Sequence, residues 1–169
     1  MEIEMKIRAL MMDPTTNSPI VVLKDVSGDS VLPIWVGLPE ANAIALEIEK
    51  ITTPRPMTHD LIKNVLTGLE ASVRKVVVSE LRDDTFFAVI WMERDGQVIS
   101  VDSRPSDALA LALRLDCPIY VEEAVLKSTK QPAPSTDKAA TDEMNKATDE
   151  EMRKWLDKLN DDDLGRYKM

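Results

Sequence analysis

Residues 34–48 read Ile-Trp-Val-Gly-Leu-Pro-Glu-Ala-Asn-Ala-Ile-Ala-Leu-Glu-Ile, and residues 99–113 read Ile-Ser-Val-Asp-Ser-Arg-Pro-Ser-Asp-Ala-Leu-Ala-Leu-Ala-Leu. The two stretches align at one constant offset. Five aligned pairs are identical: Ile34/Ile99, Val36/Val101, Ala43/Ala108, Ala45/Ala110 and Leu46/Leu111. A repeat of this kind is the sequence mark of a duplicated supersecondary unit. We therefore predict that each copy is a strand, a tight turn and the start of a helix.

The first half of the chain, about residues 1–69, is predicted to hold three strands and two helices. Apolar residues alternate with charged ones from Ile3 to Met11, which is typical of a strand with one buried face. Pro39 suits the first turn of a helix, and Thr58 is a candidate cap for the next one. The expected elements are strands over 3–11, 19–23 and 31–36 and helices over 39–51 and 58–68.

The second half, about residues 70–127, repeats the order of the first. The Asp95-Gly96 pair is a strong hairpin signal between two strands. Ser103 is a plausible N-cap for the helix that follows. The expected elements are strands over 73–81, 85–92, 97–101 and 117–121, a helix from 104 to 115 and a helical turn over 122–126. The fold class is α+β, with a largely antiparallel sheet and helices packed against it.

The remaining residues differ in composition from this domain of residues 1–127. Residues 128–140 contain Pro132, Pro134 and small polar side chains, which indicates a linker. Residues 141–169 are predicted to form a C-terminal amphipathic helix and tail. Because a short isolated helix is marginal in water, we expect this one to dock on its own domain or on a partner subunit. Its apolar residues recur at helical spacing: Met144, Met152, Trp155, Leu156 and Leu159.

Composition and net charge restrict the classes of function that this chain can have. The chain has 169 residues, of which 44% are hydrophobic, and its one cysteine, Cys117, excludes an internal disulfide. We expect a cytoplasmic protein, since the first residues do not resemble a signal peptide and no apolar stretch is long enough to span a membrane. The net charge of −9 disfavours binding of nucleic acid by charge alone. A nucleic-acid role therefore needs a local patch or a bound cation.

Two polar clusters, residues 54–60 and 102–107, each open a predicted helix. Helix N-termini attract anions through unpaired N–H groups and the helix dipole. His59 is the single histidine of the chain, and it could act as a general base if Asp60 or Asp102 lies beside it. The alternative is that His59 and Asp60 only cap their helix.

Each cluster also holds an arginine next to a proline, Arg55 or Arg104. Both arginines are candidates for contact with a phosphate. The alternative is a structural ion pair with Glu40, Asp102 or Asp107, which a guanidinium makes well. Carboxylates at the same helix ends could instead hold Mg²⁺ or Mn²⁺.

Several sequence motifs are absent, and their absence narrows the function. The chain has no Gly-x-x-x-x-Gly-Lys loop and no Gly-x-Gly-x-x-Gly, so a nucleotide cofactor is not expected. No spacing of cysteine and histidine can hold zinc. With three Trp, two Tyr and two Phe, an aromatic platform for stacking single strands is not expected either.

Together the motifs resemble those of the bifunctional nuclease family. The resemblance covers about residues 3–127 and is carried by Leu32-Pro33-Ile34-Trp35-Val36-Gly37 with Glu40-Ala41, by Pro54-Arg55-Pro56-Met57-Thr58-His59-Asp60, by Val101-Asp102-Ser103-Arg104-Pro105-Ser106-Asp107-Ala108 and by Cys117-Pro118-Ile119-Tyr120-Val121. It implies a duplicated α+β fold with a curved or barrel-like mixed sheet, assembled as a homodimer or higher homo-oligomer. It also implies an activity on both RNA and DNA, known mainly from plant members.

The functional hypothesis is metal-assisted hydrolysis of phosphodiester bonds, which requires the helix N-termini to converge in space. The expected catalytic residues are His59, Asp60, Asp102 and Arg104. The expected phosphate contacts are Arg55, Arg104, Thr58 and Ser103, and the expected ligands of Mg²⁺ or Mn²⁺ are Glu40, Asp60, Asp102 and Asp107. One rival is a non-enzymatic dimeric binding or regulatory module whose polar clusters are structural ion pairs. Another is a sensor of small anions.

Overall fold

The computed structural model describes residues 1–129 of the chain. Residues 1–129 form seven strands and four helices, in the order that the sequence predicted. They are β1 (Glu2–Met12), β2 (Pro19–Asp25), β3 (Val31–Trp35), α1 (Leu38–Ile48), α2 (Thr58–Gly68), β4 (Ser72–Arg82), β5 (Thr85–Arg94), β6 (Gln97–Ser103), α3 (Pro105–Leu115), β7 (Ile119–Glu122) and α4 (Glu123–Ser128). The C-terminal helix predicted over 141–169, and the linker beyond Thr129, lie outside the described residues.

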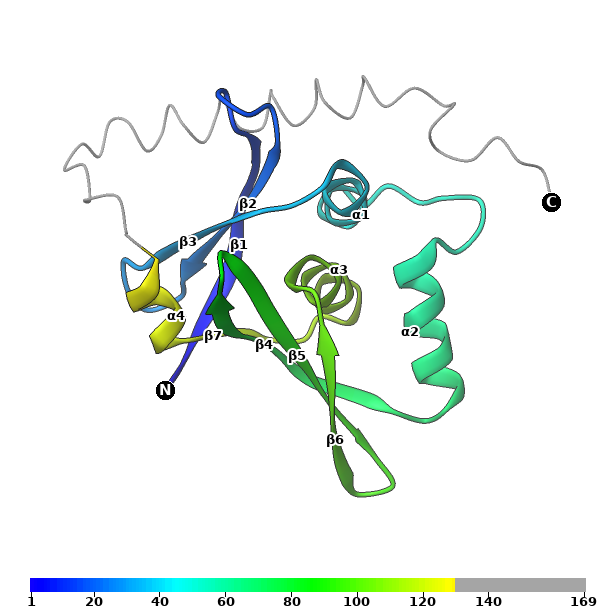
Figure 1. The fold of residues 1–169 in the computed structure, drawn as a ribbon. Coiled ribbons are helices and arrows are strands. Elements are labelled where there is room, and N and C mark those ends of the chain that lie inside the picture. Colours follow the sequence, from blue (N-terminus) through cyan, green and yellow to red (C-terminus); the bar gives the residue numbers. More distant parts are fainter. Residues whose placement is uncertain (130–169) are drawn as a thin grey trace.

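All seven strands belong to one mixed sheet with the order β3-β2-β1-β7-β4-β5-β6. The β4–β7 pair is parallel and the other neighbours are antiparallel. The expected barrel-like closure is wrong, because β3 and β6 are the two edges of an open, twisted sheet (Figure 1). The short β7 pairs with β1 on one side and with β4 on the other. It therefore links two outer groups of strands, β1–β3 and β4–β6, into one continuous open sheet.

The two outer groups of strands have the same arrangement. β1, β2 and β3 form an antiparallel meander that leads into α1, and β4, β5 and β6 form a second one that leads into α3. This matches the pattern expected of the internal repeat, although descent from one duplicated unit stays a prediction.

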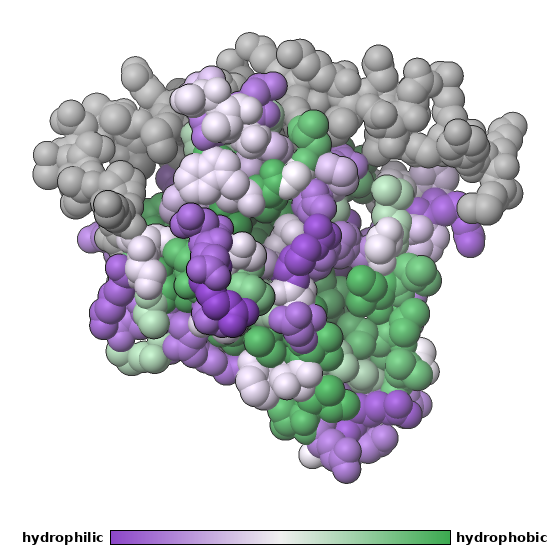
Figure 2. Space-filling model, in the orientation of Figure 1, coloured by the Kyte–Doolittle hydropathy of each residue, from purple (hydrophilic) through white to green (hydrophobic). Residues whose placement is uncertain are grey.

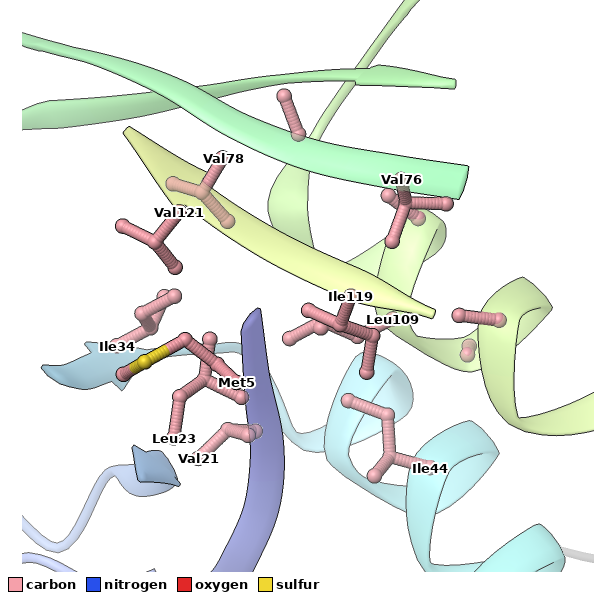
Figure 3. Close-up of a cluster of buried hydrophobic side chains, with 14 of the residues drawn as sticks. Met5, Val21, Leu23, Ile34, Ile44, Val76, Val78, Leu109, Ile119 and Val121 are labelled. Atoms are coloured by element: carbon pink, nitrogen blue, oxygen red, sulfur yellow. The ribbon is translucent and has the colours of Figure 1, made fainter. Parts of the chain in front are cut away.

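The core lies between the sheet and the paired helices α1 and α3. Small side chains line both helices, and Ala45 and Ala110 are fully buried, which lets helix backbones approach closely. Figure 3 shows Ile44 of α1, Leu109 of α3 and Ile119 of β7 gathered in one buried cluster with side chains of the sheet. No helix within residues 1–129 is long and apolar enough to cross a membrane.

The connections bring three helix N-termini together. α1 begins directly after β3 and α3 directly after β6, and α2 packs against α3. Side chains of the first turns touch: Arg104 bonds Glu40 over 2.8 Å, and His59 bonds Asp107 over 2.9 Å. The convergence that the functional hypothesis required is therefore present.

Candidate functional site

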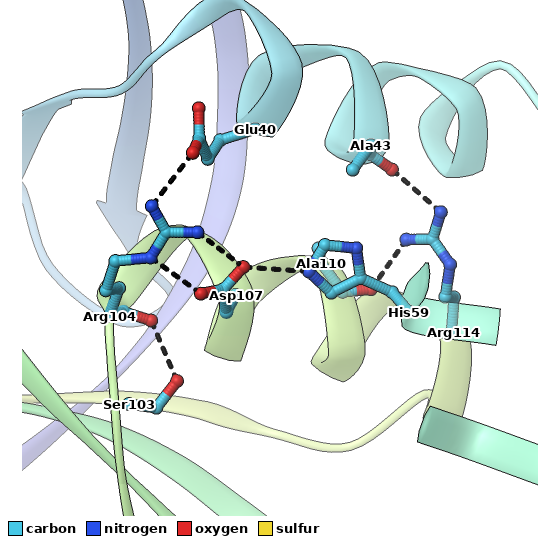
Figure 4. Close-up of polar contacts among 8 residues, drawn as sticks. All are labelled: Glu40, Ala43, His59, Ser103, Arg104, Asp107, Ala110 and Arg114. Carbon is cyan, nitrogen blue, oxygen red and sulfur yellow. Dashed lines mark hydrogen bonds and ion pairs between the residues drawn. The ribbon is translucent and has the colours of Figure 1, made fainter. Parts of the chain in front are cut away.

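Four charged or ionisable side chains form a continuous chain across the three helix N-termini (Figure 4). His59 of α2 bonds Asp107 of α3. Asp107 accepts two bonds from Arg104, from Nε over 2.8 Å and from Nη2 over 3.1 Å. Arg104 then reaches Glu40 of α1 through Nη1. We call these four residues the polar network; its members come from all three helix starts.

Arg104 is the centre of the polar network. It occupies the N-cap position of α3, although Ser103 was the expected cap. Ser103 instead ends β6 and donates its hydroxyl to the Arg104 carbonyl over 2.9 Å. Hydrogen bonds to Asp107 and then to Glu40 raise the pKa of Arg104 above its ordinary value. The side chain is still 63% exposed, so a permanent cation faces solvent at this point.

His59 lies against Asp107, and not against Asp60 or Asp102 as the sequence suggested. Burial raises the pKa of Asp107, but the bonds from Arg104 and His59 outweigh it and hold that pKa below its usual value. An ionised carboxylate only accepts hydrogen bonds, so Nε2 of neutral His59 carries the proton. Nδ1 of the ring is then an acceptor. Only 11% of the His59 side chain is exposed.

Asp60 forms a second ion pair with Arg114, a residue that the sequence did not bring forward as a candidate. Nε of Arg114 donates to Asp60 over 2.7 Å, and the other guanidinium nitrogens bond the carbonyls of Ala110 and Ala43 over 2.8 and 2.9 Å. Arg114 is thus buried and joins α3 to α1 and α2. The signal was present in the sequence: Arg114 is the single charged residue in the apolar run from Ala108 to Leu115.

Asp60 also caps its own helix. Its second oxygen accepts the N–H of Met57 over 2.9 Å, and Met57, not Thr58, is the N-cap of α2. Burial raises the pKa of Asp60, while the bonds from Met57 and Arg114 lower it more, so that the net shift is downward. This matches the alternative that Asp60 is a capping residue.

The four expected metal ligands do not gather around one point. Arg104 lies between Glu40 and Asp107, and Asp60 faces Arg114. Asp102 is exposed on the edge strand β6. Within residues 1–129, no group of three or more His, Cys, Asp or Glu side chains could hold a metal ion.

The remaining phosphate candidates are spread around the start of α2. Thr58 is the exposed first residue of that helix. Arg55 is exposed and lines a cavity of about 310 Å³ together with Asp60 and Arg114. Arg55 therefore borders the Asp60–Arg114 pair, whereas Arg104 lies in the polar network.

The lowered pKa values of the Asp60 and Asp107 carboxyl groups predict a loss of stability in acid. A group whose pKa is lower in the folded state contributes stability above its unfolded pKa, near 3.8 for these aspartates, and loses it as the pH falls through the folded value. The free energy of unfolding, measured by urea titration between pH 6 and pH 3, should therefore decline below about pH 4. Asp107→Asn should flatten this decline. The exposed hairpin variant Asp84→Asn is the control, and an equal effect of both variants would contradict the assignment.

Comparison with known proteins shows relatives of this chain. Residues 21–134 match the family model of the bifunctional nuclease domain. An uncharacterized protein of Mycobacterium tuberculosis is 38% identical over 95% of this chain and 97% of its own length. Bifunctional nuclease 1 of Oryza sativa subsp. indica is 26% identical over 78% of this chain and 42% of its own. Bifunctional nuclease 1 of Arabidopsis thaliana is 29% identical over 70% of this chain and 41% of its own length.

Proposed function

This chain belongs to the bifunctional nuclease domain family, and from that premise we propose that it hydrolyses phosphodiester bonds of RNA and DNA. The observation that carries the proposal is the bond from His59 to ionised Asp107 beside the exposed cation of Arg104. A histidine oriented by a carboxylate and placed next to a fixed positive charge is suited to acid–base chemistry on an anionic ester. The plant relatives carry the name of the activity; this chain covers less than half of their length.

In the proposed reaction Asp107 is a positioning residue and His59 is the general base. The carboxylate fixes the Nε2–H tautomer of His59, which leaves the Nδ1 lone pair to take a proton from an attacking water. The new bond forms between the water oxygen and phosphorus, and the ester P–O bond to the leaving oxygen breaks. Protonated His59 can then return its proton to that oxygen.

Arg104 would stabilise the charge that develops on the phosphate. Its guanidinium already bonds two carboxylates, but its exposed surface leaves room for an approaching phosphate oxygen. Thr58 and Ser103 lie at the same helix starts and would add contacts, as would the free N–H groups of the first turns. Arg55, beside Asp60, would hold a neighbouring phosphate of the chain.

A divalent cation would act here as a bridge and not as a resident ion. The carboxylates do not fit a caged metal, because arginines pair with three of the four candidates. Mg²⁺ commonly binds through one or two carboxylates together with substrate phosphates. We propose that Asp102, which is exposed, supplies such a contact for a cation that arrives with the nucleic acid.

Removal of divalent cations should abolish cleavage. A protein of net charge −9 repels the nucleic-acid backbone unless a cation bridges them. Labelled single-stranded RNA and DNA should be cleaved by highly purified protein in Mg²⁺ or Mn²⁺, should not be cleaved in EDTA, and should be cleaved again when the metal is restored. Asp102→Asn should raise the Mg²⁺ concentration needed for half-maximal rate, with Asp84→Asn as control. Equal cleavage in EDTA would refute the bridging role.

Two observations favour the rival function, a dimeric binding module without catalysis. Both carboxylates of the polar network are already paired with Arg104, as expected of structural ion pairs. In addition, a broad apolar surface lies open, and Figure 2 shows it in green where Figure 1 places α2 and the β5–β6 hairpin. Its members are between 38% and 65% exposed: Leu61, Ile62, Val65 and Leu69 of α2 and Val98, Ile99 and Val101 of β6.

We propose that a second copy of the chain covers this surface, whichever function holds. β6 is an edge strand with unpaired backbone groups, and an edge strand pairs readily with its own copy in a two-fold assembly. Val65→Glu should convert the dimer to a monomer in sedimentation equilibrium, whereas the exposed control Lys63→Glu on the same helix should not. A monomeric native protein would overturn this assembly. A dimer that cleaves no nucleic acid would favour the rival function.

A further inference from the structure

A groove of about 730 Å³ lies between β1 and the C-terminal ends of α1 and α3. It is remote from the polar network, because that network lies at the N-terminal ends of the same helices and eleven helical residues span about 16 Å. Its volume is in the range of ligand-binding clefts. The groove is not used by the proposed function.

The lining of the groove combines apolar and charged side chains. Ile7, Ile48 and Leu113 contribute apolar surface, and each is only partly buried by the core. Lys6, Arg8 and Lys50 place three basic groups around it, and Glu4 and Asp116 add two acidic ones. Such a lining suits an amphipathic segment with charged flanks better than it suits a small apolar molecule.

We propose that this groove binds residues 149–159 of the same chain as an amphipathic helix. Met152, Trp155, Leu156 and Leu159 are spaced so that a helix would present them on one face. Their burial against the groove supplies the driving force that so short a helix lacks in water.

The charges of the segment complement those of the groove. Asp149, Glu150 and Glu151 precede the apolar residues, where acidic groups also favour the start of a helix. They match the basic side of the groove, which is lined by Lys6, by Arg8 and by Lys50, whose Nζ also bonds Glu47 over 2.6 Å. Arg153 and Lys158, which flank the apolar face of such a helix, can in turn face the acidic Glu4 and Asp116.

The length of chain favours docking on the same molecule. The described fold ends at Thr129, which leaves 22 residues before Met152. An extended chain of that length reaches about 70 Å, about five times the radius of gyration of about 14 Å for a domain of this size. Because the segment is covalently linked to the domain, its effective concentration is in the millimolar range, well above that of a separate partner at micromolar concentration.

The native Cys117 allows a direct test, because it is the single cysteine of the chain and lines the groove. The full-length chain is treated with a maleimide at pH 8, and amide hydrogen exchange of residues 149–159 is followed by mass spectrometry. Trp155→Ser with Leu159→Ser should speed the alkylation of Cys117 at least about tenfold and should remove the amide protection of the segment. The matched control, Lys154→Ser with Asp157→Ser on the polar face of the same helix, should behave as the native chain does.

Two results would overturn the proposal. In the first, the segment of the native chain exchanges at the rate of an unstructured peptide, and both variants alkylate at the native rate. In the second, protection of the segment and of Cys117 increases with protein concentration, which would place the segment on another copy. Circular dichroism and urea unfolding confirm that the variants keep the fold. Neither readout depends on nuclease activity.

Discussion

His59→Ala is expected to lower the rate of nucleic-acid cleavage by a factor of about 10² to 10⁴, the usual contribution of general acid–base catalysis. His59 is the single histidine of the chain, so no other imidazole can take over proton transfer. The variant removes the ring that bonds Asp107 but leaves Arg104 paired with Asp107 and Glu40. Binding of phosphate should therefore persist while the chemical step slows. Single-turnover cleavage of labelled RNA, with binding measured separately, distinguishes the two.

Asp107→Asn provides the second arm of this experiment. The amide keeps the shape of the carboxylate but can no longer fix one tautomer of His59, because its nitrogen donates a hydrogen bond where the carboxylate only accepted. We expect a loss of rate comparable to that of His59→Ala, and the double variant should be no slower than either single variant, since the two residues act as a unit. Asp84→Asn on the β4–β5 turn should cleave normally. Undiminished cleavage by folded His59→Ala would point to a contaminating nuclease and would remove the basis of the proposed mechanism.

Arg114→Ala should lower the free energy of unfolding by about 3 kcal/mol, in line with the removal of one partner from a buried ion pair. Only 3% of the Arg114 side chain is exposed. The substitution leaves Asp60 without its cation, removes the bonds to the Ala43 and Ala110 carbonyls and opens a cavity between three helices. Urea unfolding followed by circular dichroism measures the effect.

One further variant and one control test whether stability depends on the full set of bonds made by Arg114 or only on its positive charge. Arg114→Lys keeps the cation but cannot reproduce three diverging bonds, so we expect an intermediate loss. Arg94→Ala is the matched control, because Arg94 is exposed at the end of β5, and surface substitutions usually change stability by less than about 0.5 kcal/mol. If Arg114→Ala proved no more destabilising than Arg94→Ala, the buried pair would not hold the helices together.

The mixed helix and strand content followed from local patterns. Alternation at period two marked β1, because the geometry of a strand repeats every two residues, and local start signals at Pro39, Thr58 and Ser103 marked α1, α2 and α3. The Asp95-Gly96 hairpin needed only its own dipeptide and the flanking strands. The helix caps were less accurate: Thr58 and Ser103 were expected where Met57 and Arg104 lie. A cap depends on which side chain reaches the free N–H groups, and here Asp60 does so from inside its helix.

The partners of the charged side chains could not be predicted from such local patterns. The sequence brought Glu40, His59, Arg104 and Asp107 forward as chemically active and left open whether Arg104 binds phosphate or pairs with carboxylates. Only the fold joined His59 to Asp107 across 48 positions, Arg104 to Glu40 across 64 and Arg114 to Asp60 across 54.

The sequence by itself therefore determined the elements, their order and the helix starts where the polar residues collect, because periodicity and turn chemistry act between residues that are neighbours in the chain. Tertiary structure decided that the sheet stays open, that Asp107 and not Asp60 orients His59, and that Arg114 is buried. Those outcomes depend on which helix ends the sheet order brings together. A side chain selects its partner by distance in space, and that distance is fixed only when α1, α2 and α3 pack.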